Sequence, residues 1–122
     1  MRDVLIVIGA AVLVAVVTPA VAVAADAEHG KALFVACAAC HQEKPDALGP
    51  SLKGVLGRRS GALEDFRYSN PMKRTNLVWD EAALREYIAD PQAKVKGNRM
   101  PYDGLHDPKD VDDIVEYIKT YK

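Results

Sequence analysis

The chain has 122 residues, a length that suits one domain and is short for two. Its 16 basic and 17 acidic side chains give a formal net charge of −1 at pH 7, which excludes the strongly basic character that nucleic-acid binding requires. Few large apolar residues are available for a core, and small domains of this kind usually need a disulfide, a metal or another group to become stable. The two cysteines of the chain, Cys37 and Cys40, are the first place to look for such a group.

The first predicted element is a secretory signal peptide over residues 1–25. A short charged start precedes residues 4–17, which carry no polar side chain, and Pro19 then breaks the run before the small residues Ala22 to Ala25. This pattern is typical of a leader that is cut near its small residues, so the mature chain should begin at Ala25 or Asp26. The prediction is a mature domain of residues 26–122. The alternative is an uncleaved membrane anchor, because the apolar stretch is long enough to span a bilayer.

Three helices are predicted in the mature domain. The first covers residues 26–39, where Asp26 suits the positive end of the helix dipole and apolar residues recur at helical spacing. The second begins at Asp80, a good N-cap, and ends before Pro91. The last and clearest runs from Asp107 and Pro108 to the C-terminus, with apolar residues on one face.

Two long loops, residues 42–78 and 91–106, separate these helices. Both are rich in glycine and proline, which interrupt regular structure, and neither shows the alternating pattern of a strand. The sequence therefore predicts an all-α domain with long loops. Such loops bury themselves poorly, which indicates that something other than side chains lies beneath them.

The stretch "CAACH" places Cys37, Cys40 and His41 three and four residues apart, so their side chains can face one object. A structural disulfide would explain the cysteines and leave the histidine without a role. A thiol–disulfide redox motif expects a strand–helix context, which is not visible. Structural zinc needs a second cluster of ligands, and His29 and His106 do not form one. The C-x-x-C-H spacing is also the signature of covalent haem attachment, which is the preferred interpretation.

Haem attachment gives both cysteines and the histidine of the motif a function. Each thiol adds across one haem vinyl group, and the adjacent imidazole binds the iron. The porphyrin also offers a large apolar surface for short helices and loops. At about 25 cal/mol per Å², it brings several kcal/mol of burial that the side chains lack.

The iron then needs a sixth ligand, for which His29, His106, Met72 and Met100 are the candidates. His29 is too close to His41 in sequence to reach the opposite haem face, and His106 borders the last helix. Met72 is better interpreted as an apolar side chain that fills a gap. Met100 lies in "KGNRMPYDG", where glycine and proline can hold a thioether rigidly, and a soft thioether opposite an imidazole raises the reduction potential. Met100 is the preferred ligand.

With these features the sequence resembles the class I cytochromes c over almost all of the mature chain. The resemblance rests on "GKALFVACAACH", "LGPSLKGVLGRRSG", "LREYI" and "MPYDG", which occur in the family's order. It implies three main helices around one covalently attached haem c, with the first and last helices crossing. It also implies thioether bonds to Cys37 and Cys40 and axial ligation of the iron by His41 and Met100.

The resemblance further implies outer residues of the haem site. The Pro50 carbonyl would accept the other imidazole N–H of His41 and so fix the ring. Tyr87 would lie near the Met100 sulfur, with Asn98 on the same loop. The remaining residues would pack on the haem or neutralise its propionates: Leu52 in packing, and Arg58, Tyr68 and Trp79 at the propionates. Met72 departs from the family, which often has an asparagine there.

The expected function is that of a monomeric periplasmic electron carrier and not an enzyme. Its donors would be a cytochrome bc complex or a dehydrogenase, and its acceptors an oxidase, a reductase, a peroxidase or a photosynthetic reaction centre. The lysine ring that mitochondrial members use for docking is thin here, so bacterial partners fit better, and the membrane is reached only through partners. The rivals are a haem enzyme or gas sensor with a labile sixth ligand, and a membrane-anchored subunit of an oxidase or dehydrogenase.

Overall fold

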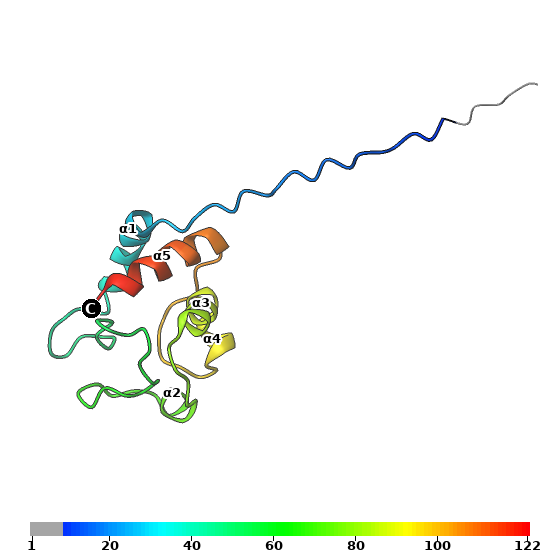
Figure 1. The fold of residues 1–122 in the computed structure, drawn as a ribbon. Helices are drawn as coiled ribbons and strands as arrows, with labels where there is room; N and C mark the ends of the chain where they lie inside the picture. The colour runs from blue at the N-terminus through cyan, green and yellow to red at the C-terminus, as the bar shows by residue number, and fades with distance from the viewer. Residues whose placement is uncertain (1–8) are drawn as a thin grey trace, which may run out of the picture.

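The computed structural model describes residues 9–122 and contains helices joined by long loops (Figure 1). In the described residues, extended pairing is limited to one isolated antiparallel bridge between Arg59 and Val78. The prediction of an all-α domain is confirmed. The helices in chain order are α1 (Ala27–Ala38), α2 (Asn70–Arg74), α3 (Glu81–Ala89), α4 (Pro91–Lys94) and α5 (Pro108–Thr120).

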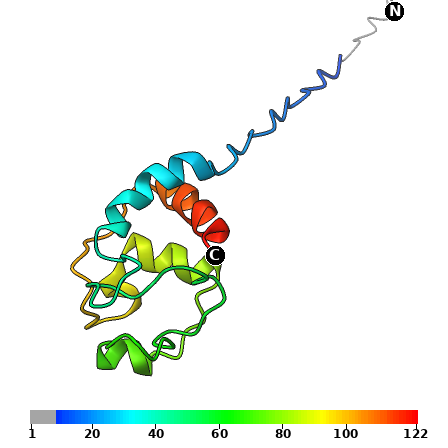
Figure 2. The ribbon, with the colours of Figure 1, turned by 90° about the vertical axis from the view of Figure 1, so that its left-hand side faces the viewer.

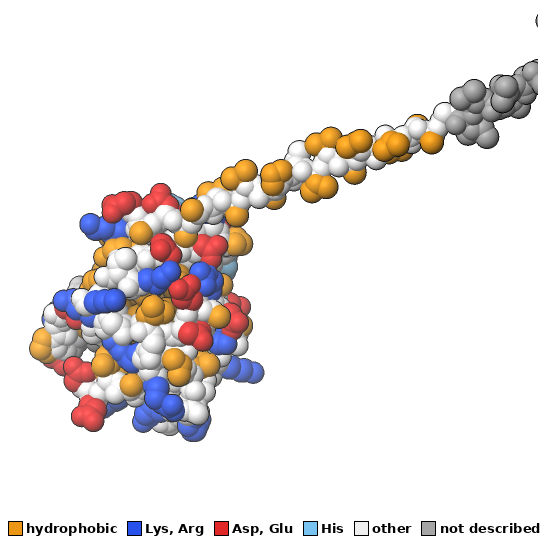
Figure 3. Space-filling view, in the orientation of Figure 1, with side chains coloured by type: hydrophobic (Ala, Val, Ile, Leu, Met, Phe, Trp, Pro, Cys, Tyr) orange, Lys and Arg blue, Asp and Glu red, His pale blue; other side chains and the backbone are white. Residues whose placement is uncertain are grey.

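Residues 9–25 form an exposed segment without regular structure that extends away from the helical body (Figures 1 and 2). Apolar side chains cover it along its length (Figure 3). Within residues 9–122, no helix combines the length and the apolar character needed to cross a bilayer. The charged start of the predicted leader lies in residues 1–8, outside the described residues.

Aspartate caps explain where the three longer helices begin. The Asp26 carboxylate accepts hydrogen bonds from the backbone N–H groups of Glu28 and His29, which otherwise have no partner in the first turn of α1. Asp80 and Asp107 cap α3 and α5 in the same way. The predicted positions of these three helices are confirmed to within one or two residues.

The short helices α2 and α4 correct the prediction that residues 42–78 and 91–106 are loops throughout. Ser69 caps α2 and Asp90 caps α4, and each helix has a proline in its first turn. A proline there lacks only an N–H that would have no helical partner, and its fixed φ suits a helix start. Pro71 and Pro91 therefore begin helices, where the sequence analysis treated them as breaks.

The core forms where α1 crosses α5 (Figure 2). Gly30 of α1 lies so close to α5 that a Cβ at this position would stand 1.9 Å from the Asp113 carbonyl oxygen. The absence of a side chain lets the two backbones meet. Beside this crossing, the ring of Phe34 packs against Tyr117 and Tyr121, with centroids 5.1 Å from each. The pair α1–α5 makes one wall, from which the loops reach round to α2, α3 and α4.

Candidate haem site

A large cavity lies between the α1–α5 pair, α3 and the two long loops. Its volume is about 640 Å³, and its lining is predominantly apolar. All residues that the sequence analysis assigned to the haem site line this cavity: Cys37, Cys40, His41, Pro50, Leu52, Arg58, Tyr68, Trp79, Tyr87, Asn98 and Met100. Segments far apart in sequence thus converge on one space.

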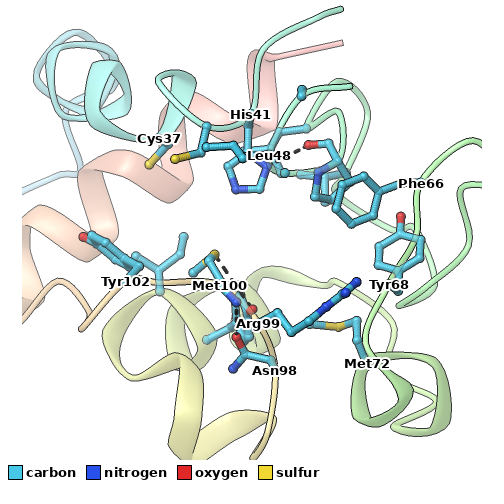
Figure 4. Close-up of a pocket in the computed structure, with 18 of the residues that line it drawn as sticks. Cys37, His41, Leu48, Phe66, Tyr68, Met72, Asn98, Arg99, Met100 and Tyr102 are labelled. Carbon is cyan, nitrogen blue, oxygen red and sulfur yellow. Dashed lines mark hydrogen bonds between the residues drawn. The ribbon is translucent and has the colours of Figure 1, made fainter. Parts of the chain in front are cut away.

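The end of α1 places the two thiols and the imidazole on one side of the cavity. The carbonyl of Cys37 accepts hydrogen bonds from the backbone N–H groups of Cys40 (3.1 Å) and His41 (2.9 Å), so the chain continues in a tight turn beyond the helix. Both cysteines are free thiols and are partly buried. Burial raises the pKa of the Cys37 thiol. The turn presents two unpaired sulfurs and a ring nitrogen to the same space (Figure 4).

The His41 ring is fixed by the loop that follows it. Its Nδ1–H donates a hydrogen bond to the Pro50 carbonyl oxygen at 2.7 Å, which leaves Nε2 with a free lone pair. Burial lowers the pKa of His41, although the bond to Pro50 opposes this effect, so the neutral ligand form is favoured. A Cβ on Gly49 would stand 2.6 Å from the ring. The absence of a side chain there makes room for the imidazole.

Met100 faces His41 from the opposite side of the cavity (Figure 4). The buried Asn98 amide holds its loop, because Nδ2 donates to the carbonyls of Pro91 (3.0 Å) and Val95 (2.9 Å) while Oδ1 accepts from the Met100 N–H (2.9 Å). The Tyr87 hydroxyl donates to the Met100 sulfur at 3.8 Å. Burial raises the pKa of Tyr87 to about 12, so this hydroxyl keeps its proton at neutral pH.

Aromatic and apolar residues form the walls between these two sides. The Trp79 ring is buried and packs on Tyr87 with centroids 4.9 Å apart. The Trp79 backbone is fixed in turn, since its N–H donates to the Arg58 carbonyl and its own carbonyl accepts from Gly57, both at 2.8 Å. Leu52 lines the cavity and packs against the same core.

Arg58 and Tyr68 bring polar groups to the lining. The Arg58 guanidinium donates to the backbone carbonyls of Ser51, at 2.7 Å, and Lys53. The Tyr68 hydroxyl accepts a hydrogen bond from the Leu63 N–H at 3.3 Å, and burial raises its pKa. Both residues therefore have protein partners in this structure, and their hydroxyl and guanidinium groups lie within a largely apolar lining.

The structure adds lining residues that the sequence analysis did not assign to the site. Phe66 packs edge-on against Tyr68, with centroids 4.9 Å apart, and the Arg99 side chain spans the cavity margin to bond the Arg67 carbonyl (Figure 4). Met72, interpreted from sequence as a gap-filling side chain, also lines the cavity. Phe66 lies in a loop without periodicity, so no sequence signal marks it.

The two histidines rejected as iron ligands lie outside the cavity. His29 is bonded through Nδ1 to the Asp113 carboxylate of α5 at 2.8 Å. His106 is exposed just before the cap of α5. Neither residue is part of the cavity lining.

These features fit a covalently attached haem. The cavity is large and apolar, two free thiols stand at its edge, and a neutral imidazole nitrogen and a thioether sulfur face each other across it. Imidazole and thioether are the donor set of low-spin haem iron in electron-transfer proteins. The space left by Gly49 admits the imidazole, and the bond to Pro50 fixes its orientation.

Comparison with known proteins agrees with this fit. A model of the cytochrome c family matches residues 27–122. The chain is 42% identical to cytochrome c2 of Blastochloris viridis over 95% of its own length and 92% of that protein, and 44% identical to cytochrome c2 of Rhodoblastus acidophilus over 81% and 95%. Among solved structures, it is similar to cytochrome cH from Methylobacterium extorquens, with 43% identity, a TM-score of 0.74 and coverage of 78% of this chain and 98% of that one. The chain therefore belongs to the cytochrome c family, and it is an electron carrier with covalently bound haem c and not an enzyme.

Proposed function

We propose that this chain carries single electrons between redox proteins of the periplasm, with haem bound through Cys37 and Cys40 and the iron ligated by His41 and Met100. One observation carries the proposal: the imidazole and the thioether face each other across an apolar cavity that has both thiols at its edge (Figure 4). Bound haem supplies a one-electron iron(III)/iron(II) couple. The protein's contribution is to keep both ligands in place and to exclude water.

The proposed roles of the surrounding residues follow from their contacts. Pro50 holds the His41 ring in the tautomer that leaves Nε2 free, and Asn98 fixes the loop that carries Met100. Tyr87 donates to the Met100 sulfur and reduces the electron density that the sulfur can give. Leu52 and Trp79 supply apolar surface for the haem. Arg58 offers a cation, and Tyr68 a hydroxyl, to the haem propionates.

The proposed location rests on the leader pattern of residues 1–25, which are removed to leave a periplasmic domain of residues 26–122. The domain is proposed to act as a monomer, because one chain supplies every proposed ligand of the cavity. Its donors are a cytochrome bc complex or a dehydrogenase, and its acceptors an oxidase, a reductase, a peroxidase or a reaction centre. Brief docking on a small interface suits such exchange.

The ligand assignment is tested by Met100→Ala, with Met72→Ala as the matched control because both thioethers line the cavity. Met100→Ala should keep haem attached, as shown by intact mass, while losing the methionine-to-iron charge-transfer band and binding carbon monoxide. Its reduction potential should fall, because the thioether favours ferrous iron. Met72→Ala should keep the band. The assignment is wrong if Met72→Ala loses the band and Met100→Ala does not.

The unaltered protein separates the carrier from a haem enzyme or sensor. A carrier should show low-spin iron in both oxidation states and should not take up carbon monoxide readily. High-spin ferric iron that binds carbon monoxide or peroxide at once would favour the sensor or enzyme. The measurement is a pair of visible spectra, oxidised and reduced, on protein made with a haem-attachment pathway.

A further inference from the structure

A buried carboxylate on α5, that of Asp113, accepts a hydrogen bond from the backbone at the start of α1. The Asp113 side chain is only 1% exposed, and its oxygens accept hydrogen bonds from three donors. These are Lys109 Nζ at 2.6 and 2.7 Å, His29 Nδ1 at 2.8 Å and the backbone nitrogen of Asp26 at 2.7 Å. The contact to Asp26 is made by the main chain, so it does not depend on the side chain at that position.

The residues directly before Asp26 are open to a peptidase. Residues 22–25 are small, exposed and without regular structure, and they belong to the segment that extends away from the body (Figures 1 and 3). The regular structure begins with Asp26 as the N-cap of α1. The boundary between the exposed segment and the folded domain therefore falls at the bond between Ala25 and Asp26.

We propose that the leader is cut between Ala25 and Asp26, and that the new amino terminus binds the Asp113 carboxylate as an ion pair. Water adds across the peptide bond and the C–N bond breaks: the Ala25 carbonyl carbon takes the water oxygen and leaves as a carboxylate, and the Asp26 nitrogen takes both water protons and becomes an ammonium. A neutral N–H donor at 2.7 Å from Asp113 Oδ1 thus becomes a charged one. Charged donors form the stronger hydrogen bonds.

The charges around this point favour one more cation. Among residues 9–122, the carboxylates of Asp26, Asp110 and Asp113 lie near two groups that can be positive, the Lys109 ammonium and the His29 imidazole. The hydrogen bond to Asp113 raises the pKa of His29. The pKa of Asp113 is lowered, mainly by its hydrogen bond from Lys109. Even with His29 protonated, the group keeps one negative charge in excess. The ammonium neutralises it.

The dipole of α1 acts in the opposite direction, because its positive end lies at Asp26. That partial charge is about half an elementary charge and is spread over the first turn. The Asp26 side chain already accepts from two N–H groups of this turn. Direct contact with a full negative charge at 2.7 Å therefore outweighs the dipole.

The site of the cut decides whether the ion pair forms. A cut after Ala24 would put the ammonium on Ala25 and leave an amide N–H on Asp113. A cut after Ala25 puts the ammonium on the atom that the structure already places against the carboxylate. The inference rests on the proposed removal of the leader, and intact mass tests that removal separately from the ion pair.

The ion pair has a defined pH dependence. An unperturbed terminal amino group has a pKa of about 7.7–8.0, and a carboxylate in contact raises it by about one unit or more. The stabilisation is fully present below about pH 7.7 and is lost as the pH rises through the raised pKa. The amine also reacts with acylating reagents only when deprotonated, so at neutral pH it should react about tenfold more slowly than an unperturbed amine.

The experiment uses exported protein with haem attached. Intact mass should give a mature chain of residues 26–122, and a chain that starts at Ala25 or keeps the leader would overturn the proposed cut. The acylation rate of the terminal amine is then measured against pH by peptide mass spectrometry. The Asp113→Asn protein should react about tenfold faster at pH 7, and equal rates would overturn the ion pair.

Two comparisons keep the test decisive if Asp113→Asn does not fold. The first is a free peptide of residues 26–32, whose amine should titrate below that of the mature protein; equal pKa values would overturn the ion pair. The second is a version exported with another leader so that residues 20–25 remain, which puts the amine far from Asp113. The melting temperature of the mature protein should fall more steeply between pH 7 and 10 than that of the extended version, and parallel curves would overturn the proposal.

Discussion

At the scale of single residues, the contact between Tyr87 and Met100 should tune the reduction potential. The hydroxyl donates to the thioether sulfur at 3.8 Å, which withdraws electron density that would otherwise stabilise ferric iron. Tyr87→Phe removes this bond and keeps the ring that packs on Trp79. The reduction potential should fall by about 20–40 mV. Sulfur is a weak acceptor, so losing the bond should change the equilibrium constant between ferrous and ferric iron by less than tenfold, and a tenfold change corresponds to about 59 mV for one electron.

The matched control for this prediction is Tyr102→Phe. Tyr102 lines the same cavity, but the hydroxyl that bonds the Met100 sulfur is that of Tyr87, so removing the Tyr102 hydroxyl should leave the reduction potential almost unchanged. Redox titration followed by visible absorbance measures both proteins. Equal shifts in the two variants would show that the general polarity of the cavity, and not the bond to Met100, sets the potential.

A second prediction at this scale concerns the space kept free for the His41 ring. Gly49→Ala would place a methyl group 2.6 Å from the imidazole, so the ring must move and its bond to the Pro50 carbonyl weakens. Overpacking of this kind costs about 1–3 kcal/mol. The free energy of unfolding and the intensity of the low-spin spectrum should both fall. Lys44→Ala, an exposed change on the same loop, should alter neither.

At the scale of elements, Gly30 should be a sensitive position of α1. Gly30→Ala gains up to about 1 kcal/mol of helix propensity, but its Cβ would stand 1.9 Å from the Asp113 carbonyl oxygen. Backbone atoms cannot give way as a side chain can, so α1 and α5 must separate. The net loss should be about 3 kcal/mol or more of unfolding free energy. Denaturant unfolding followed by circular dichroism measures it, with the exposed Lys31→Ala as control.

The three longer helices could be predicted from the sequence, whereas the two short ones could not. Asp26, Asp80 and Asp107 are local signals, since a cap bonds residues two or three positions away, and the helices that they begin were predictable. Proline is an ambiguous signal, because it breaks a helix in its interior but is favoured in the first turn. Pro71 and Pro91 both lie in a first turn. The sequence alone did not separate these two cases, so α2 and α4 were missed.

The residues that line the cavity also fall into two groups, those that local sequence patterns mark and those that only the tertiary structure brings there. Residues in motifs, such as Cys37 and His41, were predictable because spacing and resemblance mark them. Phe66 and Arg99 reach the cavity only through the tertiary path of their loops, which no local pattern encodes. The bond from His29 to Asp113 joins residues 84 positions apart, so the sequence could not indicate it.

At the scale of the whole molecule, weak charge should make electron exchange nearly independent of salt. The net charge is −1, and acidic and basic side chains are interspersed on the face seen in Figure 3. Long-range steering needs a field of one sign, which salt then screens. Oxidation rates with ferricyanide, an anion, and tris(1,10-phenanthroline)cobalt(III), a cation, should therefore change in opposite directions by less than about tenfold between low and high salt.

A charge-altered variant turns this prediction into a comparison. Glu64 and Asp65 are exposed neighbours in the loop that carries Phe66, so replacing both with lysine makes the molecule more positive by four charges without touching the cavity. The variant should react faster with ferricyanide at low salt and lose that advantage as salt increases. Stopped-flow absorbance measures the rates. A steep salt dependence in the unaltered protein would instead mean that a local charged patch, and not the net charge, governs its encounters.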